Sequence, residues 1–334
     1  MDFLKDIVKE IGDDYTQLAA DIEEEERFID TGSYIFNGLV SGSIFGGVSS
    51  NKITAIAGES STGKTYFSLA VVKNFLDNNP DGYCLYFDTE AAVNKGLLES
   101  RGIDLNRLVV VNVVTIEEFR VKALKEVDKY MKMTEDERKP CMFVLDSLGM
   151  LSTEKEIRDA LDDKQVRDMT KSQLVKGAFR MLTLKLGQAN IPLIVTNHTY
   201  DVIGSYVPTK EKGGGSGLKY AASTIIYLSK KKEKDQKEVI GNIIKAKTAK
   251  SRLSKENKDV SIRLYFDDRG LDKYYGLLEL GELGGLWKNV AGRYEINGKK
   301  IYAKQILAEP DTYFTDEVMQ ALDEIARQEF SYGS

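Results

Sequence analysis

The middle of the chain, residues 50–198, alternates between two kinds of segment. Short apolar runs predict buried strands at 52–57, 83–88, 108–114, 141–146 and 191–197. The intervening segments predict helices at 64–76, 94–101, 116–131 and 165–189, the last with apolar residues three and four positions apart. This alternation predicts an α/β fold in which a mostly parallel sheet is covered by helices on both faces.

Residues 3–29 have a different pattern. Apolar residues recur three or four positions apart from Leu4 to Ile22, which predicts a helix with one apolar face. Four consecutive glutamates, at 23–26, lead into a glycine-containing stretch at 31–33. We interpret residues 1–30 as an oligomerisation arm, although such a helix could instead pack on its own domain.

The pattern changes again after residue 198. Residues 199–216 contain several glycines and little periodicity, which is typical of a functional loop. Antiparallel strands are predicted at 223–229, 239–247 and 260–266, with the lysine-rich run 230–235 as the turn between the first two. The rest predicts a small, mainly helical tail, so we expect a core at 31–270 and a small C-terminal domain at 271–334.

Charge is unevenly distributed along the chain. The 334 residues are 42% hydrophobic and carry a net charge of −5, which excludes a wholly disordered chain. Residues 1–30 and 309–330 carry −8 and −6, whereas residues 200–263 carry +8. A basic segment of this kind attracts phosphate backbones, although a solvated lysine-rich surface has the same composition.

Cysteine usage and hydropathy bear on location. Cys84 and Cys141 cannot build a disulfide framework, and both lie in apolar runs, so we expect them to be buried and reduced. No apolar run approaches the roughly 18 residues that span a bilayer, and the first residues do not resemble a signal peptide. These features predict a cytoplasmic protein that does not contact membranes.

Residues 58–65 form a complete GxxxxGK[ST] motif between a predicted strand and a predicted helix. The motif consists of Gly58, Glu59, Ser60, Ser61, Thr62, Gly63, Lys64 and Thr65. Glycines allow successive N–H groups to turn toward phosphate oxygens, and the following helix adds its positive N-terminal end. In such a loop the lysine reaches the β- and γ-phosphates and the Thr hydroxyl ligates Mg²⁺, so the motif predicts nucleotide binding.

Acidic side chains end two of the predicted strands. Asp146 ends strand 141–146 and is the candidate second Mg²⁺ anchor, although a surface Asp after a core strand is the alternative. Asp88 and Glu90 end strand 83–88. Because strand tips on this side of a parallel sheet converge, Glu90 is expected to orient the attacking water and Asp88 to support the Mg²⁺ shell.

The single histidine, His198, lies where strand 191–197 meets the glycine-containing loop. A lone histidine is more often structural than functional. At this junction, however, a polar side chain can bond a γ-phosphate and move the loop behind it, so His198 is a candidate nucleotide sensor.

Together these motifs resemble the RecA recombinase family, and within it the phage UvsX-like recombinases. The resemblance spans about residues 30–280 and is carried by segments 58–65, 85–90, 143–148, 191–199 and 213–223. Many ATPases share the first segment, whereas the Gly-Gly-x-x-Leu-Lys-aromatic stretch in the last is much more specific. The resemblance implies a DNA-dependent ATPase that uses ATP and Mg²⁺. It also implies a homo-oligomeric helical filament on single-stranded DNA and strand exchange with a homologous duplex in recombination and repair. Mediator and single-strand-binding proteins are candidate partners.

The resemblance also assigns roles residue by residue. It makes Glu90 the catalytic glutamate and places His198 where bacterial RecA proteins have glutamine. Lys250 and Arg252 fall where neighbouring subunits reach across to the nucleotide, with Lys245 and Lys247 as rivals if the register shifts. Leu97 stands opposite the family's adenine-stacking tyrosine, which leaves base selectivity open.

Two segments, about 152–169 and 199–216, correspond to the family's DNA-binding loops. In the second loop, aromatic and apolar side chains can stack on or separate bases while lysines meet phosphates. The candidate DNA-binding residues there are Tyr200, Ile203, Tyr206, Lys210, Lys212, Gly214 and Gly215. A loop folded onto its own surface is the alternative.

Two other functions are compatible with these motifs. A hexameric RecA-fold helicase or motor would form a closed ring and unwind a forked duplex directionally. A filament accessory protein would bind ATP and barely hydrolyse it, and the acid at Glu90 argues against that alternative.

Overall fold

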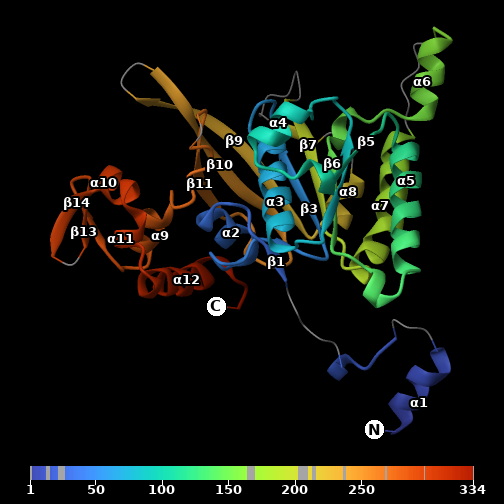
Figure 1. Ribbon diagram of the computed structural model, residues 1–334, viewed down its shortest axis with the longest axis horizontal. Helices are drawn as coiled ribbons and strands as arrows, with labels where there is room; N and C mark the ends of the chain where they lie inside the picture. The colour runs from blue at the N-terminus through green and yellow to red at the C-terminus, as the bar shows by residue number, and fades with distance from the viewer. Residues whose placement is uncertain are drawn as a thin grey trace.

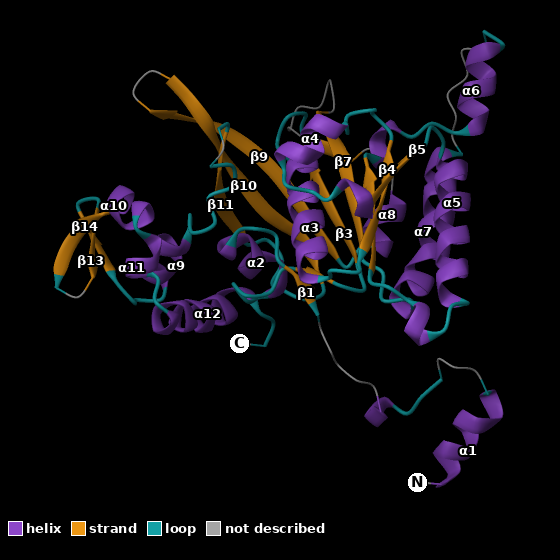
Figure 2. Ribbon diagram, in the orientation of Figure 1, coloured by secondary structure: helices purple, strands orange, loops and turns teal. Residues whose placement is uncertain are grey.

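A mixed β-sheet forms the centre of the molecule (Figures 1 and 2). The structure is a computed structural model, and it describes residues 2–12, 16–21, 27–163, 170–201, 210–212, 216–235, 238–267, 269–296 and 298–333. The six parallel strands of the sheet are β3 (Ile53–Gly58), β4 (Tyr83–Asp88), β5 (Leu108–Asn112), β6 (Cys141–Asp146), β7 (Leu193–Asp201) and β9 (Thr224–Asp235). Two antiparallel strands, β10 (Glu238–Ser251) and β11 (Asp259–Tyr265), extend it to the order β11-β10-β9-β3-β7-β6-β4-β5.

Helices cover both faces of this sheet, because each of its parallel strands presents apolar side chains in both directions. On one face, α3 (Lys64–Asn78) packs in a core with α2 (Tyr34–Ser41), and α4 (Lys95–Ser100) adds Leu98. On the other face, α5 (Ile116–Met131), α7 (Lys171–Gln188) and α8 (Ser216–Ala221) enclose a second core around Phe119 and Phe179. The predicted α/β fold with a mostly parallel, doubly covered sheet is confirmed. Cys84 and Cys141 are buried and free, also as predicted.

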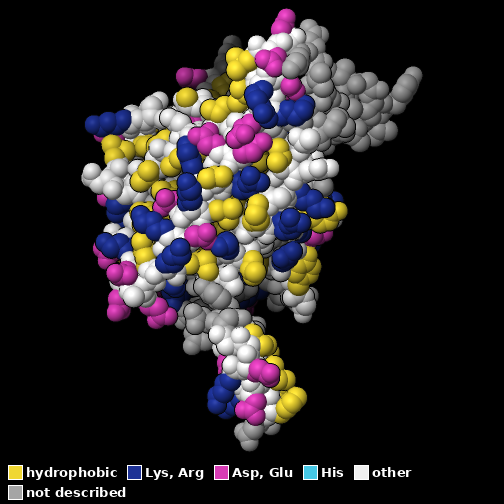
Figure 3. All heavy atoms as spheres, turned by 90° about the vertical axis from the view of Figure 1, so that its right-hand side faces the viewer, with side chains coloured by type: hydrophobic (Ala, Val, Ile, Leu, Met, Phe, Trp, Pro, Cys, Tyr) yellow, Lys and Arg dark blue, Asp and Glu magenta, His cyan; other side chains and the backbone are white. Residues whose placement is uncertain are grey.

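The single long helix predicted over residues 3–29 is wrong. Helix α1 (Asp2–Ile11) ends at Gly12, whose φ of +66° is a left-handed conformation that interrupts a helix. The chain next forms a short 3₁₀ turn at Ala19–Asp21, and β1 (Phe28–Ile29) pairs with β2 (Val48–Ser49). In Figures 1 and 3, α1 lies apart from the sheet with hydrophobic side chains along one side. Phe3 is 75% exposed and Ile11 56% exposed on this helix.

The antiparallel strands after residue 223 are confirmed, but the predicted turn at 230–235 is wrong. Those residues continue β9, and β10 begins at Glu238. Figure 1 shows this hairpin projecting beyond the rest of the sheet. Lys230, Lys231 and Lys232 are exposed there, so the lysines can adopt strand geometry without entering a core.

The two expected DNA-binding loops contain regular structure. Residues 152–169 include α6 (Glu154–Leu161), which begins with a capping box between Thr153 and Glu156. In the second loop, β7 continues to Asp201, and β8 (Lys210–Lys212) pairs antiparallel with it.

Helices make up most of the regular structure of the tail, as predicted, but the tail also contains a three-stranded sheet. Its helices are α9 (Leu277–Leu283), α10 (Ala303–Ala308), α11 (Pro310–Tyr313) and α12 (Asp316–Phe330). Its strands are β12 (Lys288–Val290), β13 (Arg293–Ile296) and β14 (Lys299–Tyr302). Leu277, Trp287 and Phe330 belong to the same hydrophobic core as α2 and α3. Within the residues that the structure describes, none of the helices combines the length and apolar character that a bilayer span requires.

Candidate active site

The loop at residues 58–65 joins β3 to α3 and has the backbone that phosphate binding needs. A side chain at Gly58 would put its Cβ 2.7 Å from the Leu228 carbonyl oxygen, so only glycine fits beside β9. Gly63 has φ +91° and Ser61 has φ +59°. Glu59, Ser60 and Ser61 are exposed at the loop tip. These features leave the N-terminal end of α3 open to an anion.

Lys64 is buried beneath this loop. Its Nζ donates hydrogen bonds to the carbonyl oxygens of Gly58, at 3.1 Å, and Glu59, at 2.9 Å. Burial lowers the pKa of Lys64, while the carboxylates of Asp146 and Glu90 act against that lowering. The ammonium group is thus held where a phosphate would enter, by carbonyls that it can exchange for phosphate oxygens.

Thr65, in the first turn of α3, meets Asp146 at the end of β6. The Thr65 hydroxyl donates to Asp146 Oδ2 at 2.7 Å, and the buried Tyr86 hydroxyl donates to the same oxygen at 2.7 Å. Thr196 donates to the other carboxylate oxygen. Asp146 is 5% exposed, and within the described part of the chain no lysine or arginine forms an ion pair with it.

This oxygen-rich pair fits Mg²⁺, which prefers hard oxygen ligands and commonly takes one or two from protein and others from substrate phosphates. Among the described residues, no three His, Cys, Asp or Glu side chains gather into a metal-binding cluster. A site shared with a nucleotide suits Thr65 and Asp146, because Mg²⁺ commonly takes its other ligands from substrate phosphates and water.

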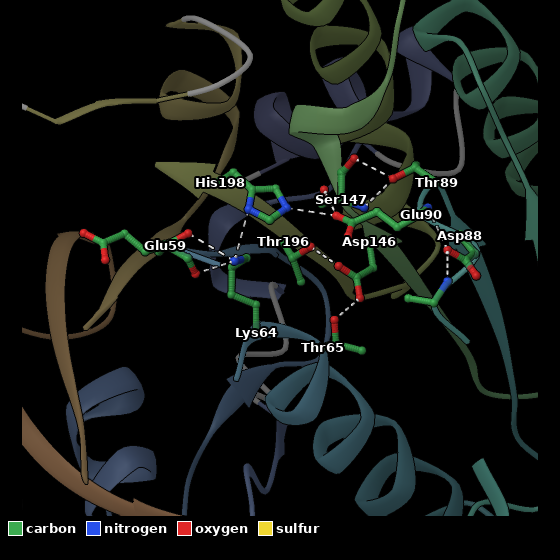
Figure 4. Close-up of polar contacts among 12 residues, drawn as sticks. Glu59, Lys64, Thr65, Asp88, Thr89, Glu90, Asp146, Ser147, Thr196 and His198 are labelled. Carbon is green, nitrogen blue, oxygen red and sulfur yellow. Dashed lines mark hydrogen bonds and ion pairs between the residues drawn. The ribbon is translucent and has the colours of Figure 1, made fainter. Parts of the chain in front are cut away.

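Glu90 lies at the centre of a second set of contacts (Figure 4). Its Oε1 accepts a hydrogen bond from Ser147 Oγ at 2.7 Å and lies 2.9 Å from His198 Nε2. Burial raises the pKa of Glu90, but the hydrogen bonds from Ser147 and His198 and the charge of Lys64 outweigh it, so the pKa lies below its usual value. Glu90 is therefore a carboxylate at neutral pH, able to accept a proton.

His198 connects Glu90 to the loop lysine. Its Nδ1 lies 3.4 Å from Lys64 Nζ while Nε2 faces Glu90. Because a lysine ammonium can only donate, a neutral imidazole protonated on Nε2 satisfies both contacts. The ring stands on β7 at the point opposite Gly58, and the same strand continues to Asp201.

Asp88 was expected to support the Mg²⁺ shell, but its carboxylate has other partners. Its carboxylate accepts hydrogen bonds from the backbone N–H groups of Glu90, at 3.0 Å, Ala92 and Val93. Asp88 therefore shapes the turn that carries Glu90, which is typical of an aspartate after a strand.

Lys250 and Arg252 lie far from Lys64 within one chain. Lys250 pairs with Ile225 of β9, which in turn pairs with Ala55 of β3. The phosphate loop begins three residues further along β3, at Gly58, which pairs with Leu228. Lys250 donates to the carbonyl oxygens of Lys219, at 2.7 Å, and Ala222, at 2.7 Å, at the end of α8. The two cations therefore face the opposite edge of the sheet from Lys64.

An open pocket of about 1040 Å³ occupies that opposite edge. Arg252 lines it together with Lys52, Lys176 and Arg180, and its described lining contains no Asp or Glu. Tyr220, which is 68% exposed, adds an aromatic wall. This surface is suited to an anionic partner.

The candidate DNA-binding residues cannot be placed in the same way. Ile203, Tyr206, Gly214 and Gly215 lie outside the described residues. For Tyr200, Lys210 and Lys212 the structure describes the backbone in β7 and β8. These assignments remain predictions.

Three site residues were missed by sequence reasoning, namely Tyr86, Ser147 and Thr196. Tyr86 and Thr196 are interior positions of apolar strands, where nothing local distinguishes a carboxylate partner from a core residue. Ser147 directly follows Asp146, and this adjacency was the only available signal. Thr89 holds Ser147, accepting a hydrogen bond from its N–H at 2.7 Å.

The parallel sheet with a phosphate loop after its central strand, two strand-tip acids and a buried loop lysine define a P-loop nucleotide-binding protein. Comparison with known proteins narrows this class. The family model described as the RecA N-terminal domain matches residues 2–272. The chain belongs to the RecA family.

Individual relatives agree with this membership. The recombination and repair protein of Enterobacteria phage T4 is 34% identical over 271 residues, which cover 81% of this chain and 67% of that protein. Protein RecA of Cereibacter sphaeroides is 27% identical over 77% of this chain and 71% of its own length. Protein RecA of Paracoccus denitrificans is 27% identical over 80% of this chain and 73% of its own length. The expected family, its recombinase function and its DNA-dependent ATPase activity are confirmed, as is the likeness to phage UvsX-like recombinases.

Proposed function

We propose that Lys64, Thr65, Asp146 and Glu90 bind and hydrolyse Mg²⁺-ATP, and that DNA binding and filament assembly depend on this nucleotide. The observation that carries the proposal is the connected set Lys64, His198 and Glu90. It joins a phosphate-binding cation, a candidate γ-phosphate sensor and a charged base within hydrogen-bond reach.

In this mechanism Lys64 exchanges the Gly58 and Glu59 carbonyls for phosphate oxygens. Thr65 and Asp146 would hold Mg²⁺, while Tyr86 and Thr196 keep the carboxylate in place. The ion, when bound, would neutralise charge on the phosphates. Glu90 accepts the proton of the attacking water, because its lowered pKa keeps it ionised.

We infer that Lys250 and Arg252 act on the nucleotide of a neighbouring copy. Their position at the edge opposite Lys64 supports this, because a head-to-tail contact would bring one subunit's basic pocket against the next subunit's phosphate loop. A head-to-tail contact of this kind generates an open helical filament when the rotation between successive subunits does not close them into a ring. The exposed apolar face of α1 supports a second contact in the same assembly.

DNA is proposed to bind the loops at about 152–169 and 199–216. His198 stands on the strand that leads into the second loop, so a γ-phosphate contact would be transmitted along β7. We further propose that the protein acts in a reducing cytoplasm, where the buried free thiols of Cys84 and Cys141 stay reduced.

Mixing two inactive variants tests this proposal. Lys64→Ala removes the phosphate-binding cation, and Arg252→Ala removes the exposed cation expected to act across the interface. Each variant alone should lose ATP turnover with single-stranded DNA. A 1:1 mixture should recover up to about a quarter of wild-type turnover, because random head-to-tail contacts then include one intact pairing in four.

Each outcome bears on a different part of the proposal. Wild-type turnover by Lys64→Ala would overturn the active-site assignment. Normal turnover by Arg252→Ala, or no recovery on mixing, would overturn its action across the interface. Electron microscopy with single-stranded DNA and a non-hydrolysable ATP analogue should show helical filaments, and closed rings would favour the helicase alternative.

A further inference from the structure

A lysine outside the phosphate loop reaches its tip. Strand β9 runs parallel to β3, and their pairing ends with Gly58 opposite Leu228. Lys230 stands two residues further along β9, beyond the end of that pairing. From there Lys230 Nζ donates a hydrogen bond to the Ser61 carbonyl oxygen at 2.8 Å.

This contact gives a carbonyl group of the loop a partner from a different element, the neighbouring strand β9. A phosphate-binding loop presents its N–H groups to the ligand, so its carbonyls need partners elsewhere. The carbonyl oxygens of Gly58 and Glu59 accept hydrogen bonds from Lys64, and the Thr62 hydroxyl also donates to the Glu59 oxygen at 2.9 Å, so these partners come from residues 58–65 themselves. Lys230 serves Ser61, a non-glycine residue with φ +59°. That backbone conformation is unfavourable for a residue with a side chain, so it gains from an external partner.

Lys230 also adds positive charge at the loop. Burial lowers the pKa of Lys64, and the nearby charge of Lys230 contributes to that lowering, against the opposing carboxylates of Asp146 and Glu90. Two cations from different elements thus approach one loop. The negative charge of a bound polyphosphate would offset the repulsion between these two lysines.

Strands β9 and β10 pack closely against the phosphate loop. Gly58 meets the Leu228 backbone, and Gly63 would place a Cβ 3.3 Å from Ile244 of β10. Lys230 therefore extends from a strand packed directly against the loop. Its side chain is exposed, so its substitution should leave the core intact.

We propose that Lys230 is a positioning residue for the phosphates of a bound nucleoside di- or triphosphate. It holds the Ser61 carbonyl away from the ligand and adds a second cation to the site. The inference rests on the proposed function of the loop, and it adds a residue from the β9–β10 hairpin to the nucleotide site.

Titration of ADP and of a non-hydrolysable ATP analogue, without DNA, tests the inference. Lys230→Ala should weaken both nucleotides about three- to tenfold, the range expected for one charge-assisted hydrogen bond at an exposed site. Lys230→Arg, which keeps the charge and the donor, should stay within about twofold of wild type. In ATPase assays with single-stranded DNA, Lys230→Ala should raise KM and leave kcat unchanged, because the contact precedes the chemical step.

Lys232→Ala is the matched control, since Lys232 is an exposed lysine two positions further along the same strand. It removes the same charge from the hairpin and should leave nucleotide affinity unchanged. Equal effects of Lys230→Ala and Lys232→Ala, or no effect of either, would overturn the inference. If Lys64→Ala abolishes nucleotide binding while Lys230→Ala does not alter it, this inference alone fails. If Lys64→Ala binds nucleotide normally, the proposed function fails as well.

Discussion

Replacing Glu90 with glutamine separates chemistry from binding at the active site. The Glu90 carboxylate accepts from Ser147 at 2.7 Å and faces His198 at 2.9 Å. A glutamine carbonyl can accept the Ser147 hydrogen bond but cannot serve as a base at neutral pH. We expect kcat for ATP hydrolysis to fall about 10²–10⁴-fold, the usual contribution of a positioned general base.

Binding and stability should change little in the same variant. The Glu90 side chain is 33% exposed, so loss of its charge should alter the free energy of unfolding by less than about 1 kcal/mol. Nucleotide affinity should stay close to wild type because Lys64, Thr65 and Asp146 are untouched. Filaments on single-stranded DNA should therefore last longer.

The assay is phosphate release with saturating single-stranded DNA, alongside nucleotide titration and urea unfolding. Glu99→Gln, on the exposed side of α4, is the control and should hydrolyse ATP normally. A kcat within threefold of wild type, or filaments that fall apart faster, would refute the assignment of Glu90 as the base.

The pH dependence follows from the same contacts. The pKa of Glu90 is lowered from the ordinary 4.5, so the folded protein favours the ionised form more than the unfolded chain does. Its contribution to stability is therefore present above pH 4.5 and is lost as pH falls through the lowered value. In the wild type, the rate of ATP hydrolysis should fall with decreasing pH only below pH 4.5, and this fall should be absent in Glu90→Gln. A fall above pH 4.5 that disappears in Glu90→Gln would contradict the contacts described.

Further predictions concern the sensor, the carboxylate and the arm. His198→Ala should keep ATP binding but lose most of the ATP-dependent gain in single-stranded DNA affinity, a coupling of about 5–150-fold in such systems; DNA titrations with ATP analogue and ADP measure it, and a retained gain would make His198 structural. Tyr86→Phe removes one hydrogen bond to the buried carboxylate of Asp146 and should lower the unfolding free energy by about 1.5–3 kcal/mol; urea denaturation that shows no loss would mean that the other donors suffice. Deleting α1 (Asp2–Ile11) should weaken self-assembly in light scattering while leaving nucleotide binding intact, and unchanged assembly would assign α1 to its own subunit.

Much of the site could be predicted because its central features are local in sequence. The phosphate loop occupies eight consecutive residues, and its glycines, lysine and threonine are required by the backbone and charge of a phosphate cradle. Asp146, Glu90 and His198 each follow an apolar run, so a parallel sheet brings them to one edge whatever the strand order. The strands and helices of the core could also be predicted locally. A strand that is buried on both faces needs a continuous apolar run, and such runs alternate with helical segments in this sequence.

Local patterns failed where the outcome depended on an element's surroundings. The helix predicted over 3–29 stops at Gly12, where backbone freedom outweighs the apolar repeat. The lysine run at 230–235 forms strand because the projecting hairpin leaves its lysines in solvent, although lysine-rich composition suggested a turn. Because consecutive residues of this run, Lys230 to Lys232, are all exposed, the strand carries no alternating hydrophobic pattern that would identify it in the sequence.

Only the tertiary structure decided which side chains meet. Ser147 lies 57 positions from Glu90, Tyr86 lies 60 from Asp146, and Lys230 lies 169 from Ser61. These pairs depend on the strand order β9-β3-β7-β6-β4, in which most adjacent strands are not consecutive along the chain, and on the register between the strands. A tyrosine or threonine inside an apolar strand looks the same in the sequence whether its hydroxyl group faces the hydrophobic core or a carboxylate. The motif therefore follows from the chain itself, whereas the partners that hold each catalytic group follow from the packing of its strands.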